Sequence, residues 1–207
     1  MVVSQYFNIH PDNPQPRLIH QAVERVRQGD VIVYPTDSAY AIGCHIGDKK
    51  ALDKIRRIRQ VDAKHNFTLV CRDLSEISTY AKVSNHVYRV INAHTPGAYT
   101  FILEATREVP KRLQHPKRKT IGIRVPDNRI VMALLSELNE PLMSSTLILP
   151  GEEMPMTDAE EIRDRLEHDV DLVIDGGHCG IEPTTVLTLQ NENIEVVRVG
   201  KGDVSSF

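Results

Sequence analysis

Features that mark several well-known protein classes are scarce in this chain of 207 residues. No stretch approaches the roughly 18 consecutive apolar residues that a membrane-spanning helix needs. The N-terminal stretch MVVSQYFNIHPDNPQ lacks the basic flank and the apolar run of a secretory signal. We therefore expect no membrane partner and a cytoplasmic location.

Cysteine is also rare, and the usual signatures of catalytic sites are missing. Cys44, Cys71 and Cys179 are far apart and show no CxxC spacing, which indicates neither a disulfide framework nor a zinc site. The motifs GxSxG, HExxH and GxGxxG and the P-loop signature are absent. The nine histidines show no ligand spacing, so we predict no bound metal and no prosthetic group. His65 and His178 are interpreted as structural or solvent-exposed.

Charge is nearly balanced overall but unevenly distributed. The net charge of −3 excludes a polycation that coats nucleic acid. Residues 111–124 carry six basic side chains and no acid, whereas residues 152–175 carry ten acids and two arginines. This asymmetry predicts either one face that attracts phosphates or a solvated surface with salt bridges.

The order of the predicted elements indicates an α/β fold. Apolar periodicity predicts helices at about 14–29, 49–59, 74–81, 86–93 and 128–138, and a Thr157–Glu160 capping box starts another that ends near His168. Strands are predicted at 31–34, 40–43, 67–71, 99–105, 120–125, 141–146, 171–175, 184–189 and 194–199. Elements alternate early and strands cluster late, which predicts one domain spanning 1–207, a mixed sheet with flanking helices.

The stretch GDVIVYPTDSAYAIGC, residues 29–44, is the strongest local candidate for a ligand site. A buried strand at 31–34 leads into a turn in which Thr36, Asp37 and Ser38 place three oxygen-bearing side chains. Such a loop, held between two strands, is a plausible ligand floor. The alternative is ordinary turn chemistry, because Asp and Ser bond to their own backbone.

Arginines within apolar strands are the most informative cations. Arg124 in TIGIRVP and Arg198 in IEVVRVG would each be costly to bury unpaired, so each requires a carboxylate, a carbonyl group or a bound anion. A paired arginine within the sheet is the competing interpretation. Together with Arg59, Lys64 and the hydroxyls near Ser145, they form a scattered set of candidate phosphate ligands.

Seven blocks of sequence, taken in order, resemble the YrdC/YciO family. They are GDVIVYPTDSAYAIGC (29–44), RIRQVDAKHNFTL (57–69), TPGAYTFIL (95–103), KTIGIRVPDN (119–128), EPLMSSTLILPG (140–151), DLVIDGGHCGIEPTTVLTL (171–189) and VVRVG (196–200). Better-known members of that family make threonylcarbamoyl-adenylate from threonine, bicarbonate and ATP for the modification of adenosine in tRNA. The resemblance implies a twisted sheet with a concave, positively charged face.

The resemblance also implies which residues hold the substrates. Thr36 and Ser38 match the hydroxyls of the family's proline-threonine-aspartate loop, and Ser145 matches the first residue of its serine-alanine-asparagine signature. With the cations named above, the predicted substrate- and nucleotide-binding residues are Thr36, Ser38, Tyr40, Arg59, Lys64, Thr100, Arg124, Ser145, Thr184 and Arg198. No catalytic residue is assigned, because positioning and charge neutralisation would carry attack on the α-phosphate of ATP.

Departures from the synthase branch place the chain nearer the YciO branch. A lysine and an arginine two residues apart in that branch correspond here to Arg59 and Val61, and the asparagine of the signature corresponds to Leu147. Each charge-assisted hydrogen bond contributes roughly 1.5 to 3 kcal/mol, so losing two predicts nucleotide handling weaker by roughly 3 to 6 kcal/mol. The tyrosine-glycine pair of that branch is Tyr40-Ala41 here.

Three functions are compatible with these residues. The first is threonylcarbamoyl-AMP synthase-type activity on ATP with Mg²⁺, L-threonine and bicarbonate, with AMP as a further ligand. The second is non-catalytic binding of double-stranded or structured RNA, for which the candidates beyond Arg59 and Lys64 are Arg56, Arg57, Lys117, Arg118 and Lys119. The third is hydrolysis of a related adenylate or carbamoyl compound, for which the sequence identifies no catalytic base.

Overall fold

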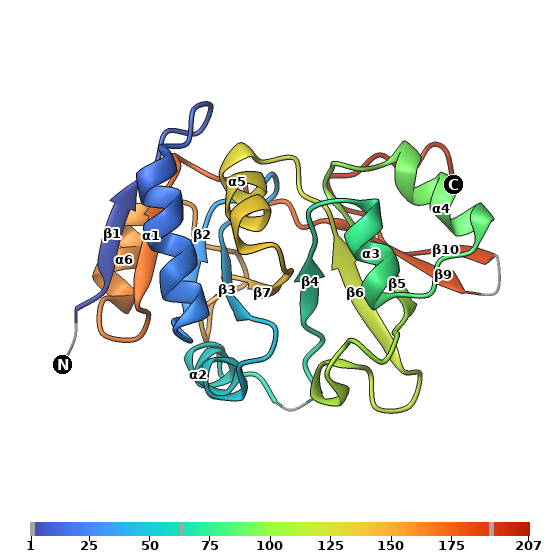
Figure 1. Ribbon diagram of the computed structural model, residues 1–207, viewed down its shortest axis with the longest axis horizontal. Coiled ribbons are helices and arrows are strands. Elements are labelled where there is room, and N and C mark those ends of the chain that lie inside the picture. The colour runs from blue at the N-terminus through green and yellow to red at the C-terminus, as the bar shows by residue number, and fades with distance from the viewer. Residues whose placement is uncertain (1–2, 63, 191–192) are drawn as a thin grey trace.

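Ten strands form one mixed sheet in the computed structural model, which describes residues 3–62, 64–190 and 193–207 (Figure 1). The strands are β1 (Gln5–Asn8), β2 (Ile32–Tyr34), β3 (Ala41–His45), β4 (Thr68–Val70), β5 (Tyr99–Glu104), β6 (Thr120–Arg124), β7 (Leu142–Thr146), β8 (Leu172–Asp175), β9 (Thr185–Gln190) and β10 (Asn193–Arg198). Their spatial order is β1-β8-β2-β3-β7-β4-β6-β5-β9-β10. The sheet contains both parallel pairs, such as β4 with β6, and antiparallel pairs, such as β3 with β7, which confirms the predicted mixed sheet.

Helices flank this sheet. They are α1 (Pro16–Arg27), α2 (Lys49–Arg59), α3 (Leu74–Tyr80), α4 (Asn85–Ala93), α5 (Arg129–Leu138) and α6 (Ala159–Leu166), with a short 3-10 turn at Lys111–Leu113. Among the residues described, none of these helices is long and apolar enough to cross a membrane. The arrangement is a single mixed α/β domain, as the sequence predicts.

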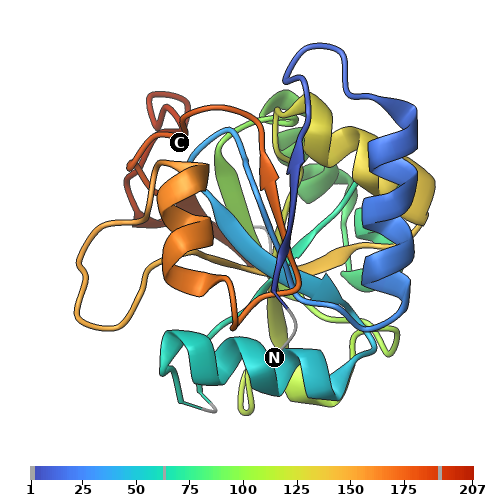
Figure 2. The same cartoon turned by 90° about the vertical axis from the view of Figure 1, so that its left-hand side faces the viewer.

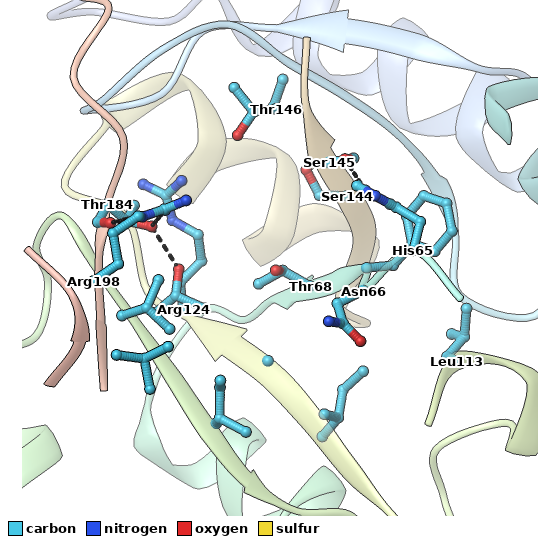
Figure 3. Close-up of a pocket in the computed structure, with 18 of the residues that line it drawn as sticks. His65, Asn66, Thr68, Leu113, Arg124, Ser144, Ser145, Thr146, Thr184 and Arg198 are labelled. Atoms are coloured by element: carbon cyan, nitrogen blue, oxygen red, sulfur yellow. Dashed lines mark hydrogen bonds between the residues drawn. The ribbon is translucent and has the colours of Figure 1, made fainter. Parts of the chain in front are cut away.

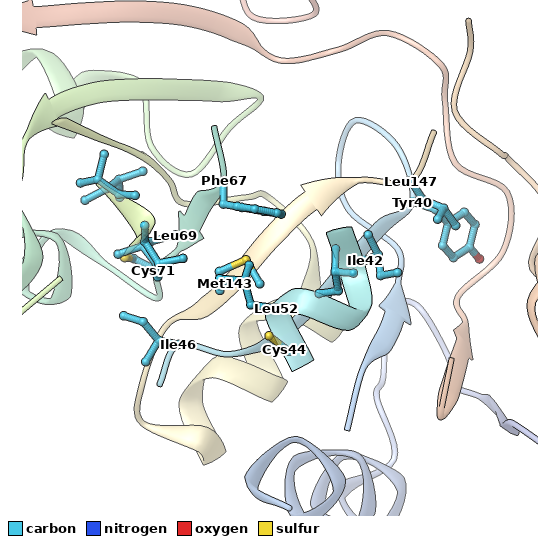
Figure 4. Packing of buried hydrophobic residues seen from close by; sticks show 14 of the residues in the cluster. Tyr40, Ile42, Cys44, Ile46, Leu52, Phe67, Leu69, Cys71, Met143 and Leu147 are labelled. Atoms are coloured by element: carbon cyan, nitrogen blue, oxygen red, sulfur yellow. The ribbon is translucent and has the colours of Figure 1, made fainter. Parts of the chain in front are cut away.

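Two apolar cores lie on opposite faces of the sheet. Side chains alternate along β2, so Ile32 and Tyr34 join one core while Val33 joins the other. The smaller core packs α1 and α5 against β2 and β8, and Figure 2 shows these two helices together on one side of the sheet. The larger core includes side chains from α2, α3, α4 and α6, and Figure 4 shows part of it around Leu52 and Met143.

Two helix starts differ from the sequence prediction. The Thr157–Glu160 capping box is wrong, because the carboxylate of Asp158 accepts the Glu161 backbone N–H at 2.9 Å and takes the N-cap position. The first helix begins at Pro16 rather than near Pro14, because a proline disfavours helical backbone in the residue before it, and Gln15 is extended with ψ of 119°. Both corrections shift a boundary by one or two residues and leave the element in place.

The strands beyond β3 leave one face of the sheet open. Val70 belongs to the core under α5, and Thr68 lies two residues earlier on the same face. On β5, Phe101 is buried in the larger core, whereas Thr100 lines a cavity on the other face. This part of the sheet therefore presents polar side chains to a cavity that neither α1 nor α5 fills.

Candidate functional site

A cavity of about 450 Å³ occupies this open face. Its volume falls within the roughly 300–1,000 Å³ typical of small-molecule sites. The cavity lining contains four arginines, Arg59, Arg118, Arg124 and Arg198, together with eight serine or threonine side chains. None of the lining residues that the structure describes is an aspartate or a glutamate. A site of this composition favours anionic ligands.

The structure brings most of the predicted binding residues together. Those that line the cavity are Ser38, Arg59, Thr100, Arg124, Ser145, Thr184 and Arg198. Thr36 and Tyr40 are buried just behind this lining, and Lys64 is exposed and lies outside it. The binding roles of all ten residues, and the concave positively charged face, stay predictions.

The turn at residues 36–39 combines both interpretations of its sequence. The Thr36 hydroxyl donates to the Ala39 carbonyl oxygen at 2.6 Å and accepts the Ser38 and Ala39 backbone N–H groups at 3.2 Å each. Thr36 therefore closes the turn, as ordinary turn chemistry predicts. Ser38 and Ala39 are left facing the cavity, so the same turn forms part of its wall.

Arg124 is held by the turn that it faces. Its guanidinium donates to the Asp37 carboxylate and, at 3.3 Å, to the Ser38 hydroxyl. Both members of the Arg124–Asp37 pair are about nine-tenths buried, and the second Asp37 oxygen accepts the Asp127 backbone N–H at 2.8 Å. The Asp37 carboxylate is thus the partner that Arg124 requires, because this arginine lies in an apolar strand. Its buried Nε has no hydrogen-bond partner in the part of the chain that the structure describes.

A hydroxyl pair and Arg198 lie next to Arg124 in the same wall. The Thr100 and Thr184 hydroxyls are 2.8 Å apart, and Arg198 donates to the Thr184 carbonyl oxygen at 2.9 and 3.2 Å. The second strand arginine is therefore satisfied by a carbonyl group. Burial lowers the pKa of Arg198 from its ordinary value.

A second polar cluster lies across the cavity floor from the first, as Figure 3 shows with Thr68 and Asn66 between them. Arg59 donates through Nε to the Ile148 carbonyl oxygen at 3.2 Å and through Nη1 to the Ser145 hydroxyl. His65 Nε2 is 3.0 Å from both Arg59 Nη1 and Ser145 Oγ. Burial, the charge of Arg59 and that of Arg56 lower the pKa of His65, whereas Asp62 raises it.

His65 was missed as a cavity residue by the sequence reasoning, which treated it as structural or solvent-exposed. It contacts Ser145 across 80 positions of the chain, so no local spacing could have marked the pair. The only sequence signal was their place in two different blocks of the family resemblance. His115, Asn66 and Thr68 were also missed and line the cavity with it.

The RNA candidates divide into two groups. Lys117, Arg118 and Lys119 are exposed on the loop between β5 and β6, and Arg118 also lines the cavity. Arg56 and Arg57 lie on α2, where the Arg56 guanidinium is 5.5 Å from the centre of the Phe67 ring and 3.4 Å from Asp53. Arg56 is therefore less free to meet a phosphate backbone than the exposed Arg57 and the three loop cations.

The departures from the synthase branch involve apolar packing. Leu147 is fully buried and its backbone N–H donates to the Tyr40 carbonyl oxygen at 2.9 Å, as their proximity in Figure 4 illustrates. Val61 is partly buried against the larger core. The Tyr40 hydroxyl donates to the Gly177 carbonyl oxygen at 2.7 Å.

Within the described ranges, no group of three or more His, Cys, Asp or Glu side chains is placed to hold a metal ion.

Comparison with known proteins places this geometry in a family. The Sua5/YciO/YrdC family model, described as telomere recombination, matches residues 24–200. The chain is 60% identical to the uncharacterised protein YciO of Escherichia coli over 99% of this chain and 100% of that protein. The crystal structure of E. coli YciO superposes with a TM-score of 0.93, covering 98% of each chain.

The names of more distant relatives state an activity or a ligand. A threonylcarbamoyl-AMP synthase of Vibrio vulnificus is 27% identical over 76% of this chain and 86% of that protein. The structure of P. abyssi Sua5 complexed with L-threonine shares the fold with a TM-score of 0.87 at 20% identity, over 95% of this chain and 58% of that one. The resemblance seen in the sequence is confirmed: the chain belongs to the Sua5/YciO/YrdC family.

Proposed function

We propose that this protein binds ATP and L-threonine in the cavity and catalyses threonylcarbamoyl-AMP synthase-type chemistry. In this reaction threonine and bicarbonate give threonylcarbamate, whose carboxylate attacks the α-phosphate of ATP and displaces pyrophosphate. The observation that carries the proposal is the cavity lining, with four arginines, eight hydroxyls and no acid among its described residues. Relatives named as threonylcarbamoyl-AMP synthases support the choice of reaction.

The cations of the cavity are arranged to bind two anions at once. Arg124 and Arg198 lie at one end and Arg59, which contacts Ser145, at the other, with the Thr68 hydroxyl on the strand between them. A triphosphate at one end and a carbamate or carboxylate at the other would each meet a guanidinium. Holding both reactants in one geometry supplies much of the rate enhancement of such a reaction.

The chemistry needs charge neutralisation more than a protein nucleophile. Charge moves onto pyrophosphate as the bond to the α-phosphate breaks, and arginines in a partly buried site stabilise that charge more strongly than water does. Mg²⁺ enters bound to the phosphates of ATP, since divalent magnesium in such sites relies largely on substrate oxygens.

The test is pyrophosphate release. Protein incubated with ATP, Mg²⁺, L-threonine and bicarbonate is expected to release pyrophosphate, with threonylcarbamoyl-AMP identified by mass spectrometry. Omission of threonine or of bicarbonate must each abolish the signal. No pyrophosphate above the ATP-only background, even at high enzyme concentration, would overturn the proposal.

Arg198→Ala tests whether ATP binds in the cavity or elsewhere on the surface. Removing a charge-assisted hydrogen bond worth roughly 1.5–3 kcal/mol should weaken ATP binding by about 10- to 100-fold in calorimetric titration. Arg165→Ala is the matched control, because Arg165 is exposed and pairs with Glu152 at 3.2 Å away from the cavity lining. Equal ATP affinities in the two variants would place the nucleotide elsewhere.

Binding of structured RNA without turnover is the second candidate, and one observation favours it. Lys117, Arg118 and Lys119 are exposed on one loop, and among the described residues none of the three forms an ion pair with an acidic side chain. Arg118 extends this group to the cavity lining. Charges in this arrangement can contact successive phosphates.

Salt dependence distinguishes this candidate. Affinity for a short RNA duplex should fall steeply between about 50 and 200 mM salt, since binding releases condensed counterions. Replacing Lys117 and Lys119 with alanine should reduce the slope by about one per lost phosphate contact. Absence of RNA retention at low salt, or a flat salt profile, counts against RNA binding.

A further inference from the structure

Ser145 and His65 form a contact that synthase chemistry does not require. Ser145 Oγ lies 3.0 Å from His65 Nε2, within the range for proton transfer from a nucleophile to a base. Arg59 Nη1 contacts the same two atoms. All three side chains line the cavity, on the side away from Arg124 and Arg198 (Figure 3).

The hydrogen bonds among these groups fix where the protons lie. A guanidinium only donates, so Arg59 Nη1 must donate to His65 Nε2, which is therefore the unprotonated nitrogen. The Ser145 hydroxyl accepts from Arg59, and its own proton can reach the single lone pair of Nε2 only when the Arg59 N–H does not occupy it. A small shift of Nη1 away from Nε2 frees that lone pair, and the neutral imidazole can then remove the serine proton.

The sheet and a neighbouring ring position this pair. Ser145 lies on β7, where its backbone pairs with Ile42 of β3, while the pairing of β7 with β4 stops at Ser144. The His65 ring packs edge-on against Phe67, with centroids 5.0 Å apart and planes at 76°. Burial and the charge of Arg59 keep the pKa of His65 below its ordinary value, so the ring is neutral at neutral pH.

We propose that Ser145 and His65 are a nucleophile and its general base, and that they hydrolyse acyl- or carbamoyl-adenylates. Ser145 Oγ bonds to the carbonyl carbon while its proton passes to His65 Nε2. The bond from the carbonyl carbon to the phosphate oxygen breaks, and AMP leaves with that proton. Water then bonds to the acyl carbon and gives a proton to His65, which returns it to Ser145 Oγ as the ester bond breaks.

The cavity determines the class of substrate. Arg124 and Arg198 at its far end suit the phosphate of an adenylate, and Ser145 faces the acyl group from the opposite side. Arg59 is a positioning residue, since it holds Ser145 and His65 together through Nη1 and is itself anchored by the Ile148 carbonyl oxygen at 3.2 Å. This activity requires neither ATP nor threonine, so its test is separate from that of the synthase.

Diisopropyl fluorophosphate is the first probe, because it labels serines that have an activated hydroxyl. The intact protein should gain one adduct by mass spectrometry, and peptide mapping should place it on Ser145. Ser144, the neighbouring residue, is an internal reference because its hydroxyl is 2.6 Å from the Tyr34 hydroxyl and contacts no histidine among the described residues. An adduct on Ser144 or another residue, or no adduct, would refute the proposal.

His65→Gln tests the base. Loss of a general base should slow labelling by about 10²-fold or more. His178→Gln is the matched control, since His178 is exposed and lies outside the cavity lining. In the wild-type protein the labelling rate should rise with pH around a midpoint below 6.5, the ordinary pKa of histidine, and then level off, because burial and the charges of Arg59 and Arg56 outweigh that of Asp62. Equal rates in both variants, or a profile that still rises above pH 8, would overturn the role of His65.

Acetyl-adenylate is the second probe, and it tests turnover. Wild-type protein should release AMP from it faster than buffer does, and Ser145→Ala should abolish the excess. AMP release without pyrophosphate formation in the synthase assay would support hydrolysis and reject the synthase. Pyrophosphate formation with neither labelling of Ser145 nor AMP release from acetyl-adenylate would support the synthase and reject hydrolysis.

Discussion

The two polar ends of the cavity are each centred on an arginine, but the charges of those arginines are balanced differently. Arg124 on β6 is paired with the Asp37 carboxylate, and the two side chains are 9% and 10% exposed. Among the described residues, the hydrogen-bond partners of Arg59 on α2 are neutral groups: the Ile148 carbonyl oxygen, His65 and Ser145. One guanidinium is thus neutralised within the protein, and the other keeps its charge for the cavity.

This difference assigns the two arginines to different tasks. Arg124 fastens the turn at residues 36–39 to the sheet, because Asp37 bridges Arg124 and the Asp127 backbone N–H. In the part of the chain that the structure describes, Arg59 has no carboxylate partner, and its partial burial lowers its pKa. A buried ion pair mainly fixes geometry, whereas an uncompensated cation favours a bound anion. We therefore expect substitutions in the Arg124–Asp37 pair to affect mainly stability and those at Arg59 to affect mainly binding.

Asp37→Ala should have the largest effect. It would leave Arg124 buried without its carboxylate, which typically costs about 3–5 kcal/mol of stability. Denaturant unfolding followed by circular dichroism would measure this loss. Replacing both charges, as in Asp37→Ala with Arg124→Leu, should restore part of the stability because no unpaired charge stays buried.

An exposed ion pair provides the matched comparison. Arg165 and Glu152 are 41% and 48% exposed, so Glu152→Ala should cost less than about 1 kcal/mol. If Asp37→Ala were as mild as Glu152→Ala, the Arg124 end would not be held by its ion pair and the contrast between the two ends would fail.

The sequence could predict the Arg124 end better than the Arg59 end. An arginine inside an apolar strand requires a partner, and the sequence offers a carboxylate and a hydroxyl in the turn at residues 36–39. The mixed sheet and its helices were likewise predictable, because they follow from local periodicity. His65 was not, since its contact with Ser145 depends on how the segment after α2 packs against the end of β7.

Arg59→Ala should have an intermediate effect, and on binding rather than folding. Losing one charge-assisted hydrogen bond to a bound anion, worth roughly 1.5–3 kcal/mol, should weaken ATP affinity by about 10- to 100-fold in calorimetric titration. Unfolding should change far less than in Asp37→Ala, because Arg59→Ala leaves no unpaired charge behind. A large loss of stability with unchanged ATP affinity would reverse the roles assigned to the two ends.

Arg59→Lys sharpens the same prediction. Lysine keeps the charge but lacks the planar fork that contacts Ile148, His65 and Ser145 together. ATP affinity should therefore recover in part, while labelling of Ser145 by diisopropyl fluorophosphate should stay slow. Full recovery of both would show that Arg59 acts by charge alone.

The smallest effect concerns the pH dependence of stability at the Arg59 end. The folded-state pKa of His65 lies below the ordinary value of 6.5, so between these two values the unfolded chain binds more protons than the folded one. The contribution of His65 to stability is therefore complete above about pH 6.5 and decreases as the pH falls through the folded-state pKa. The difference in unfolding free energy between wild type and His65→Gln should change with pH in this window and be constant above it.

In the Arg59→Ala background the change should be smaller but still present, because burial is the larger cause and Arg59 the second. If the difference did not change with pH, His65 would titrate as it does in water, and the Arg59 end would not hold the neutral imidazole that the proposed hydrolysis requires.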